Sequence, residues 1–282
     1  MSNEILVTGA SGFVGRRLVS RLRAQGEVVR EFSECDGDIA RSPLDFPHVS
    51  HVFHLAARTY VPDSWREPRP FFETNVLGLV NVLDFCARQK AALVLLSSYV
   101  YGHPRSLPIA EDHPLEAFNP YSLTKILAEQ TAAFYRDKHQ LAVTIVRPFN
   151  LYGPGQADHF LVPMLIRQAL DPGAKFYEVE DDGPRRDHLF IDDLIDLALA
   201  CRNRPGGVYN AGSGRSVGIG ELAALINAAA GVEKPVRSRG RRRPDEVMDV
   251  VADISRAQAE LGWSPRVSLK DGLAATVASM RA

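Results

Sequence analysis

Hydrophobic and polar residues alternate in two patterns along the first half of the chain. Short apolar runs predict strands over 5–8, 28–32, 51–55, 93–96 and 143–146. Between these runs, apolar residues recur at helical spacing and predict helices over 13–25, 72–89 and 121–139. Strands that alternate with helices predict an α/β fold with a doubly wound parallel sheet, covered by helices on both faces.

The pattern changes after residue 147, where proline and glycine break the chain into short elements. Helices are predicted over 192–201, 219–230 and 269–280, and residues 207–210 are expected to rejoin the sheet. We therefore expect one domain around the parallel sheet, formed by residues 1–147 and 187–212. A smaller lobe is expected from residues 148–186 and 213–282.

Composition and charge exclude several classes of function. The 282 residues are 45% hydrophobic and 24% charged, which is typical of a soluble globular protein. The net charge of −1 gives no reason to expect a nucleic-acid partner or a membrane surface, and no apolar run is long enough to span a bilayer. Without a basic, apolar leader, a signal peptide is not expected. The three cysteines, without a CxxC pair, are expected to be reduced thiols in a cytoplasmic protein.

Two groups of residues suggest binding sites that we do not expect. His51 and His54 are three apart in a predicted strand and so face opposite sides, which argues against a metal site. The arginine-rich run 237–243 invites a nucleic-acid interpretation. Because the chain is neutral overall, a solvated loop with one or two phosphate ligands is the better interpretation.

A glycine-rich turn lies between the first strand and the first helix. Gly9, Gly12 and Gly15 have the spacing at which one glycine permits a tight turn, the next lets a phosphate approach, and the third allows close packing. The helix N-terminus would supply free N–H groups to a pyrophosphate. Ser33 falls where an acidic residue would bind the adenosine ribose, so NAD and NADP both remain open. Arg16 either helps to bind a phosphate or lies in solvent.

A tyrosine and a lysine supply candidate chemistry. Tyr121 and Lys125 lie four apart in a predicted helix and share one face. A phenol has a pKa near ~10, and an adjacent ammonium favours its ionised form, which brings the tyrosine into the range of an acid/base. With a serine such as Ser97 to hold a substrate hydroxyl and a dinucleotide nearby, the set predicts hydride transfer.

These residues resemble a known family over nearly the whole chain: the extended short-chain dehydrogenases/reductases with a Rossmann fold, and among them the nucleotide-sugar epimerase/dehydratase group. The segments that carry the resemblance are Thr8-Gly-Ala-Ser-Gly-Phe-Val-Gly15, His54-Leu-Ala-Ala57, Asn75-Val-Leu-Gly78, Ser97-Ser-Tyr-Val-Tyr-Gly102, Tyr121-Ser-Leu-Thr-Lys125, Arg147-Pro-Phe-Asn-Leu-Tyr-Gly-Pro-Gly155, Arg186-Asp187 before Ile191-Asp-Asp193, Asn210-Ala-Gly-Ser-Gly214 and Leu261-Gly-Trp-Ser-Pro265. YxxxK alone is weak, but this order and spacing are specific.

The resemblance implies a role for each matching residue. Tyr121 would be the acid/base, Lys125 would lower its pKa and bind the nicotinamide ribose, and Ser97 would hold the reacting oxygen. The implied cofactor contacts are Gly9, Ser11, Gly12, Phe13, Val14, Gly15, Ser33, Asp38, Ile39, Leu55, Ala56, Ala57, Asn75, Tyr121 and Lys125. The implied substrate contacts are Thr59, Ser97, Ser98, Tyr99, Asn150, Arg186 and Arg243.

Three of the implied substrate contacts would bind the nucleotide diphosphate. Asn150, Arg186 and Arg243 match those positions, and arginine presents a planar fork to phosphate oxygens. Asn150 has the alternative of ordering its own loop, Arg186 that of pairing with Asp181 or Asp182. Asp38 has the alternative of forming a turn.

The resemblance leaves three hypotheses of function. The first is a 4-epimerase similar to UDP-glucose 4-epimerase, with retained cofactor; the second is a reductase of 4-keto-6-deoxy nucleotide sugars. Ser33 slightly favours the reductase, because a weak grip on the ribose suits an exchanging cofactor. Dehydration is disfavoured, because Ser98 and Tyr99 stand where the dehydratase branch has an Asp-Glu pair. The third hypothesis is a dinucleotide sensor without catalysis, although a sensor need not keep Ser97, Tyr121 and Lys125 together.

A homodimer paired through helices 72–89 and 121–139 is also implied.

Overall fold

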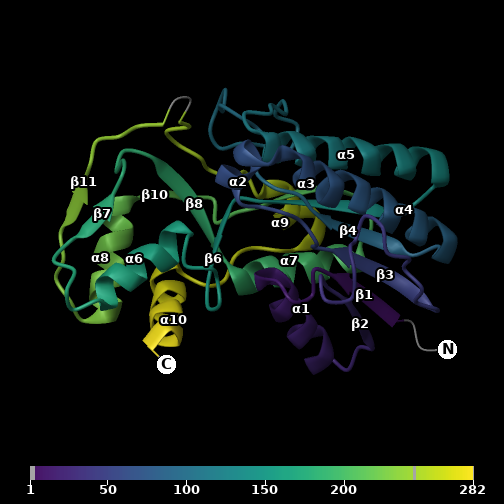
Figure 1. The fold of residues 1–282 in the computed structure, drawn as a ribbon, viewed down its shortest axis with the longest axis horizontal. Coiled ribbons are helices and arrows are strands. Elements are labelled where there is room, and N and C mark those ends of the chain that lie inside the picture. Colours follow the sequence, from purple (N-terminus) through teal and green to yellow (C-terminus); the bar gives the residue numbers. More distant parts are fainter. Residues whose placement is uncertain (1–3, 244–245, 282) are drawn as a thin grey trace.

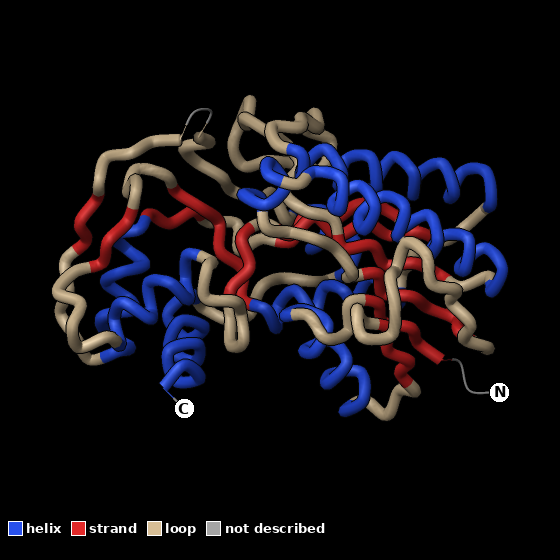
Figure 2. Tube along the Cα trace, viewed as in Figure 1, coloured by secondary structure: helices blue, strands red, loops and turns tan. Residues whose placement is uncertain are grey.

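The computed structural model describes residues 4–243 and 246–281 and is built around one large parallel sheet (Figures 1 and 2). Its six strands lie in the order β2-β1-β3-β4-β5-β9, and all neighbours are parallel. They are β1 (Glu4–Thr8), β2 (Val29–Phe32), β3 (Val49–His54), β4 (Ala92–Leu96), β5 (Val143–Pro148) and β9 (Gly207–Ala211). The predicted doubly wound sheet is confirmed, including the return of the chain at residues 207–210.

Helices cover both faces of this sheet, as Figure 1 shows. Helices α1 (Phe13–Ala24) and α7 (Ile191–Asn203) pack together on one face, and α4 (Gly78–Gln89) and α5 (Pro120–His139) on the other. Leu18 and Leu22 of α1 join the core of the first face, while Leu79 and Leu83 of α4 join that of the second. These buried positions recur three and four residues apart, as the hydrophobic pattern requires.

The helix predicted over 72–89 is divided. Helix α2 (Val61–Arg66) and helix α3 (Pro68–Phe72) precede a π-helical turn, η1 (Glu73–Leu77), and only then does α4 begin. Pro68 and Pro70 lie in the first turn of α3, where their missing N–H groups cost nothing. The hydrophobic period alone did not predict the π-helical turn.

Helix α5 begins one residue before Tyr121 because its N-terminus is capped. The Asn119 side chain accepts a hydrogen bond from the Ser122 N–H at 2.7 Å, and the Ser122 hydroxyl accepts one from the Asn119 N–H at 3.1 Å. Pro120 occupies the first turn. This reciprocal cap fixes the start of the helix and so the direction in which Tyr121 points.

The rest of the chain forms a smaller lobe beside the sheet. A three-stranded sheet joins β6 (Asn150–Tyr152), β8 (Arg185–Phe190) and β10 (Ser216–Gly218), and a two-stranded sheet joins β7 (Tyr177–Val179) and β11 (Val236–Ser238). Its helices are α6 (Leu161–Leu170), α8 (Ile219–Ala230) and α10 (Leu269–Arg281), whereas α9 (Ser255–Leu261) packs against α7 and β9 of the large sheet. The helices predicted over 219–230 and 269–280 are therefore present. Searched over the described residues, no helix is long and apolar enough to cross a membrane.

Candidate active site

The glycine-rich turn has the geometry that its spacing predicted. Gly9 adopts φ +69°, and a Cβ on it would lie 2.6 Å from the Ala56 nitrogen. A Cβ on Gly15 would lie 2.1 Å from the Gly9 carbonyl oxygen, so the third glycine lets α1 pack directly against the turn. The start of α1 is thus held beside the ends of β1 and β3, where a pyrophosphate would meet its N–H groups.

Two cavities meet at this turn, and Gly9, Gly12, Leu55 and Ala57 line both of them. One, of about 650 Å³, extends along the end of β2 and is lined by Ser11, Ser33, Asp38, Ile39 and Ala56 among others. The other, of about 460 Å³, extends toward the lobe. Its lining includes the predicted residues Phe13, Val14, Gly15, Thr59, Ser97, Ser98, Tyr121 and Asn150. The two cavities together would accommodate the adenosine half of a dinucleotide and then its nicotinamide half with a substrate.

At the adenosine end, Ser33 orders the backbone. Its Oγ accepts a hydrogen bond from the Ser11 N–H at 3.1 Å, and its own N–H donates to the Asp36 carboxylate at 2.8 Å. Asp38 forms a turn, because its carboxylate accepts from the Ala40 N–H at 2.9 Å. Asp38 also lines the cavity, so both interpretations of this residue apply.

The charges around this end are mainly negative. Glu34, Asp38 and Glu73 line the cavity together with one cation, Arg58. Arg41 lies 3.6 Å from Asp38 and 3.7 Å from Glu73 and offsets part of their charge. Sequence reasoning placed Ser33, with Glu34 beside it, at this end and missed Glu73, which the fold brings in from the turn before α4.

The two serines after β4 point to different partners. The Ser97 hydroxyl, in a residue that is only 4% exposed, donates to the buried Glu129 carboxylate. Ser98, the next residue, lines the cavity together with Ser97 and Tyr121, and its side chain lowers the pKa of Tyr121. The Ser97 hydroxyl is thus bonded to Glu129, whereas the Ser98 side chain acts on Tyr121; the role that the resemblance implies for Ser97 stays a prediction.

Lys125 is buried one helical turn below Tyr121. Its Nζ donates to the Leu96 carbonyl at 2.7 Å, which ties α5 to the end of β4. Burial lowers the pKa of Lys125 to about 8, although the nearby Glu129 carboxylate raises it. Burial likewise raises the pKa of Tyr121, and the hydrogen bond from Ser98 lowers it. Phe71 of α3 packs edge-on against the Tyr121 ring and contributes to this burial.

A buried ion pair supports this part of the site. Arg147 of β5 donates to Glu129 at 2.6 Å, and both side chains are about 5% exposed. The same guanidinium donates to the Tyr101 hydroxyl at 3.0 Å, and Tyr101 donates to Asn210 of β9 at 2.5 Å. The chain of contacts therefore connects α5, β5 and β9 beneath the cavity. The sequence pattern did not identify Glu129, although it lies four residues after Lys125 on the same helix face.

Two implied contacts, Asn75 and Tyr99, have partners within the protein. Asn75 donates to the Arg58 carbonyl at 3.0 Å and to the Thr124 hydroxyl at 2.9 Å, and it accepts from the Arg58 N–H at 2.8 Å. Asn75 thus fixes the cavity wall at Arg58, and its contact with the cofactor stays a prediction. The Tyr99 hydroxyl donates to the Gly102 carbonyl at 2.6 Å, and its ring packs against Phe149.

The diphosphate-binding residues differ in their surroundings. Asn150 lines the cavity and donates to the Asp187 carbonyl at 3.2 Å, so it both orders its strand and faces the space. Arg186 is half-buried and pairs with Glu246, not with Asp181 or Asp182. Arg243 is exposed and precedes residues 244–245, which are outside the described range. Contacts of Arg186 and Arg243 with a diphosphate remain predictions.

The arginine-rich run 237–243 lies along β7, and its arginines form ion pairs with acidic residues of 178–181. Arg239 contacts Glu178 and Glu180, and Arg242 contacts Asp181. Arg237 stacks on the ring of Phe176. The acidic residues of 178–181 thus neutralise much of the run. This arrangement explains how seven residues rich in arginine fit into a chain that is neutral overall.

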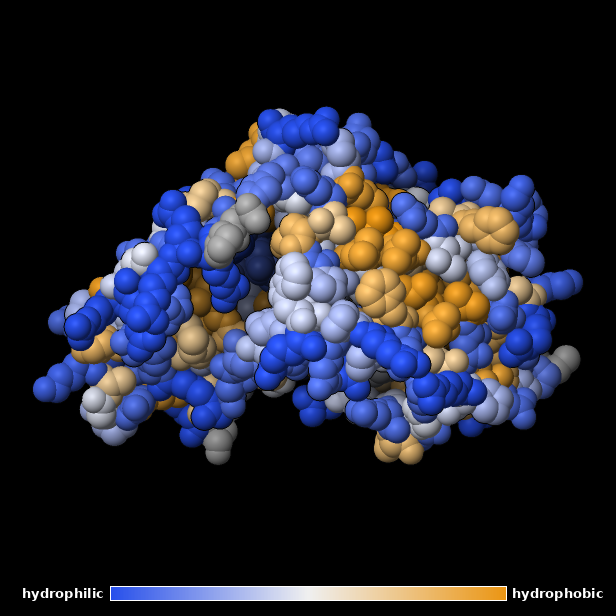
Figure 3. All heavy atoms as spheres, turned by 45° about the horizontal axis from the view of Figure 1, so that its top comes forward, coloured by the Kyte–Doolittle hydropathy of each residue, from blue (hydrophilic) through white to orange (hydrophobic). Residues whose placement is uncertain are grey.

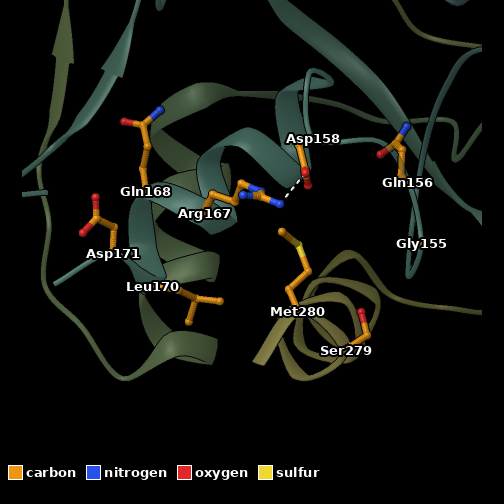
Figure 4. Close-up of a pocket in the computed structure, with 9 residues that line it drawn as sticks. All are labelled: Gly155, Gln156, Asp158, Arg167, Gln168, Leu170, Asp171, Ser279 and Met280. Carbon is orange, nitrogen blue, oxygen red and sulfur yellow. Dashed lines mark hydrogen bonds and ion pairs between the residues drawn. The ribbon is translucent and has the colours of Figure 1, made fainter. Parts of the chain in front are cut away.

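A further hollow lies between α6 and α10, next to the loop at Gly155 (Figure 4). Arg167 and Asp158 form an ion pair across it, and Met280 of α10 faces the same space. Its lining contains neither the glycine-rich turn nor a tyrosine, whereas the cavity that extends toward the lobe has both. We therefore place the chemistry in the cavity that contains Tyr121.

Known proteins show the same fold and motifs. The family model described as the NAD dependent epimerase/dehydratase family matches residues 5–212. The chain belongs to this family. It is 32% identical to GDP-6-deoxy-D-mannose reductase of Pseudomonas aeruginosa, over 98% of this chain and 96% of that protein. It is also 32% identical to UDP-glucose 4-epimerase of Mycolicibacterium smegmatis, over 98% of each chain.

Structural similarity agrees with this assignment. The structure of RMD from Pseudomonas aeruginosa complexed with NADPH superposes with a TM-score of 0.92 at 31% identity, over the full length of both chains. The protein is accordingly an NAD(P)-dependent enzyme with a Rossmann fold. The hypothesis of a non-catalytic sensor is set aside. The epimerase and the reductase among its relatives are equally similar, so the reaction must be argued from the site.

Proposed function

We propose that the protein is a 4-epimerase that acts on a nucleoside diphosphate sugar and retains NAD. The observation that carries the proposal is the cavity in which Ser98 and Tyr121 lie between the glycine-rich turn and Asn150 of the lobe. This places a hydroxyl pair at the junction of a dinucleotide site and a substrate lobe. Hydride transfer requires both ligands to meet at such a junction.

The residues divide the chemistry among them. Tyr121 would take the proton of the sugar C4 hydroxyl while the C4 hydride passes to the oxidised nicotinamide, which is the chemistry that the bound dinucleotide supplies. The resulting 4-ketone would turn and take back the hydride on its other face, and Tyr121 would return the proton. Ser98 would hold the reacting oxygen, in place of Ser97, because Ser97 already donates to Glu129.

Elimination of water is disfavoured by the lining of the cavity. Among the described residues that line it, none is an aspartate or a glutamate. A dehydratase needs a base to remove the proton next to the ketone, and carboxylates are the usual choice. The absence of carboxylates at Ser98 and Tyr99 thus extends to the whole lining.

The charge at the adenosine end supports the choice of NAD. A 2′-phosphate would meet Glu34, Asp38 and Glu73, with Arg58 and Arg41 as the counter-charges. This net repulsion favours NAD over NADP. A 4-epimerase begins with the oxidised cofactor and regenerates it, so a bound NAD serves the whole cycle. The 4-keto-6-deoxy sugar reductase remains the alternative, favoured by the similarity to the Pseudomonas aeruginosa reductase.

One experiment separates the two reactions. The protein is incubated with UDP-, GDP- and dTDP-sugars, with and without NADPH, and the products are followed by NMR. An epimer formed without net consumption of cofactor supports the proposal, whereas loss of one NADPH per 4-keto sugar identifies the reductase. Tyr121→Phe should lower turnover by orders of magnitude and leave cofactor affinity unchanged; near-normal turnover in this variant would rule out Tyr121 as the acid/base.

A further inference from the structure

A buried histidine faces the active-site cavity without a hydrogen-bond partner. His188 of β8 is 7% exposed, lines the cavity, and neither of its ring nitrogens finds a partner among the described residues. Most buried polar side chains in proteins are hydrogen-bonded, because an unpaired one loses its water without compensation. An unpaired imidazole in the wall of a ligand cavity therefore indicates a missing ligand group.

The position of His188 in β8 directs it toward the substrate. Arg186 and His188 are two residues apart and project from the same face of the strand, whereas Asp187 between them projects from the other. On that other face, the Asp187 carboxylate accepts from the N–H groups of Ser213, Gly214 and Ala252. Four contacts of this kind, including the Ser213 hydroxyl, hold the strand rigidly and fix the direction of His188.

The neighbours of His188 are polar on one side and aromatic on the other. His188 lies opposite Asn150 in the parallel pairing of β6 with β8. The Tyr152 ring meets its ring edge-on, with 6.3 Å between centroids. Phe160, Leu161 and Val162 line the same cavity. The surroundings of the ring are thus mainly apolar, and the cavity is the side from which a polar group of a ligand can reach it.

The imidazole is neutral. Burial is the main cause that lowers its pKa to about 4, and the positive charge of Arg186 lowers it further. A neutral imidazole offers one donor and one acceptor, which matches a hydroxyl group, whereas a phosphate oxyanion is better matched by a cation. The chemistry of the ring therefore points to an uncharged part of the substrate.

We propose that His188 binds a hydroxyl group of the nucleotide sugar, on the sugar or on the ribose, and so helps to determine which substrate the enzyme accepts. This inference rests on the proposed function, since it needs a nucleotide sugar in the cavity. A site that hydrogen-bonds a substrate hydroxyl discriminates against analogues that lack it. His188 would supply such discrimination from the lobe, on a strand separate from the catalytic helix.

The test combines binding with stability in His188→Phe. Phenylalanine keeps a flat ring and removes the unpaired nitrogens. Without ligand, this variant should melt at the wild-type temperature or roughly 2–4 °C above it, because an unsatisfied buried group is lost. By calorimetry on the NAD-loaded protein, it should bind the cognate nucleotide sugar about tenfold more weakly. His188→Gln, which restores a donor and an acceptor, should recover part of that affinity.

A matched control removes a hydroxyl from the same lobe outside the cavity. The Tyr177 hydroxyl donates to Asn227 at 2.8 Å, so Tyr177→Phe should lower the melting temperature and leave affinity unchanged. The two variants are thus expected to have opposite effects. A structural role for His188 would instead make His188→Phe behave like the control.

Two ligands identify the hydroxyl. If His188→Phe lowers the affinity for both the nucleoside diphosphate and the nucleotide sugar, the contact is with the nucleotide. If it lowers only the affinity for the nucleotide sugar, the contact is with the sugar. Wild-type affinity for both ligands in His188→Phe would overturn the inference and leave the proposed function intact. If the wild-type protein binds no nucleotide sugar of the panel, the proposed function fails, and the inference fails with it.

Discussion

Lys125 donates a hydrogen bond from Nζ to the carbonyl oxygen of Leu96 at 2.7 Å, and this contact joins the active-site helix to the end of β4. It also holds a cation in a dry environment, where burial lowers the pKa of Lys125 to about 8. The charged form of Lys125 favours the ionised form of Tyr121. A charge on Lys125 that assists Tyr121 would therefore be lost as the pH rises through about 8.

We expect an alkaline limb near pH 8 in the pH profile of kcat/KM. Above that pH, Lys125 loses its proton and no longer stabilises the Tyr121 phenolate, so the rate falls. Lys125→Arg keeps the positive charge at all accessible pH values and should move the limb to higher pH, even if the maximal rate is lower. An alkaline limb that stays in place in Lys125→Arg would contradict this assignment.

The two serines provide a matched pair of variants. Ser98→Ala should lower kcat by roughly 10²–10³-fold, because the hydroxyl that meets Tyr121 and the reacting oxygen is removed. Ser97→Ala should keep kcat within a few-fold and lower the melting temperature, since a buried donor to Glu129 is lost. A larger loss of kcat in Ser97→Ala than in Ser98→Ala would return the catalytic role to Ser97.

The sequence predicted the large sheet because most of its strands, such as β1 and β4, are short apolar runs and the helices between them show helical periodicity. It also identified the glycine turn, since the required φ and close contacts leave no alternative at Gly9 and Gly15. The lobe was less predictable, because β6, β7, β8 and β10 are short and are stabilised by pairing between distant segments.

The details of the site depended on tertiary contacts. No spacing rule predicts the partner of the Ser97 hydroxyl. The buried Glu129–Arg147 pair supplies it, because the Glu129 carboxylate accepts a hydrogen bond from Ser97. The same holds for Glu246, which is sixty residues from its partner Arg186. Periodicity predicts elements, but the partners of polar groups follow only when the elements are assembled.

The acidic residues Glu34, Asp38 and Glu73 at the adenosine end predict a preference for NAD over NADP. The wild-type protein should bind NAD at least tenfold more tightly than NADP, measured by calorimetry or by fluorescence of the reduced forms. Glu34→Arg places a cation where the 2′-phosphate would lie and should reduce this preference or reverse it. Glu233→Arg, an exposed change of the same charge in the lobe, is the control and should leave the preference unchanged. Tighter binding of NADP by the wild-type protein would instead favour the reductase.

Two buried neutral histidines predict loss of stability in mild acid. Burial lowers the pKa of His54 to about 3 and that of His188 to about 4, both from 6.5. Below pH 6.5 the unfolded chain therefore binds more protons than the folded one, and the free energy of unfolding falls as pH falls. Each histidine should cost about 2 kcal/mol between pH 6.5 and pH 5.

Urea unfolding at pH 7, 6 and 5 measures this slope. His188→Phe should make the dependence on pH shallower, because only His54 then contributes its share. The control is His103→Gln, a change at an exposed histidine, which should leave the slope as it is. An identical slope in His188→Phe and the wild-type protein would show that the pKa of His188 is the same in the folded and the unfolded chain, and would contradict this prediction.

An apolar surface over α4 and α5 predicts a homodimer. Figure 3 shows apolar side chains gathered over this helical layer. Leu123 and Phe134 of α5 are 39% and 57% exposed, and their spacing of eleven positions, about three helical turns, brings both onto one face of the helix. Leu77 and Trp65, which are also exposed, come from η1 and α2, elements that pack against α5. Contiguous exposed apolar surface of this kind is typical of an interface.

We expect the wild-type protein to sediment as a dimer at micromolar concentration. Phe134→Asp buries a charge in the proposed interface and should shift the population toward the monomer, whereas Val28→Asp, an exposed apolar position beside β2, should not. Because Leu123 is two residues from Tyr121, the partner would also stiffen the start of α5. Phe134→Asp should therefore have a lower melting temperature than the wild-type protein, and the difference should depend on protein concentration. A monomeric wild-type protein would contradict the pairing of α4 and α5 across subunits.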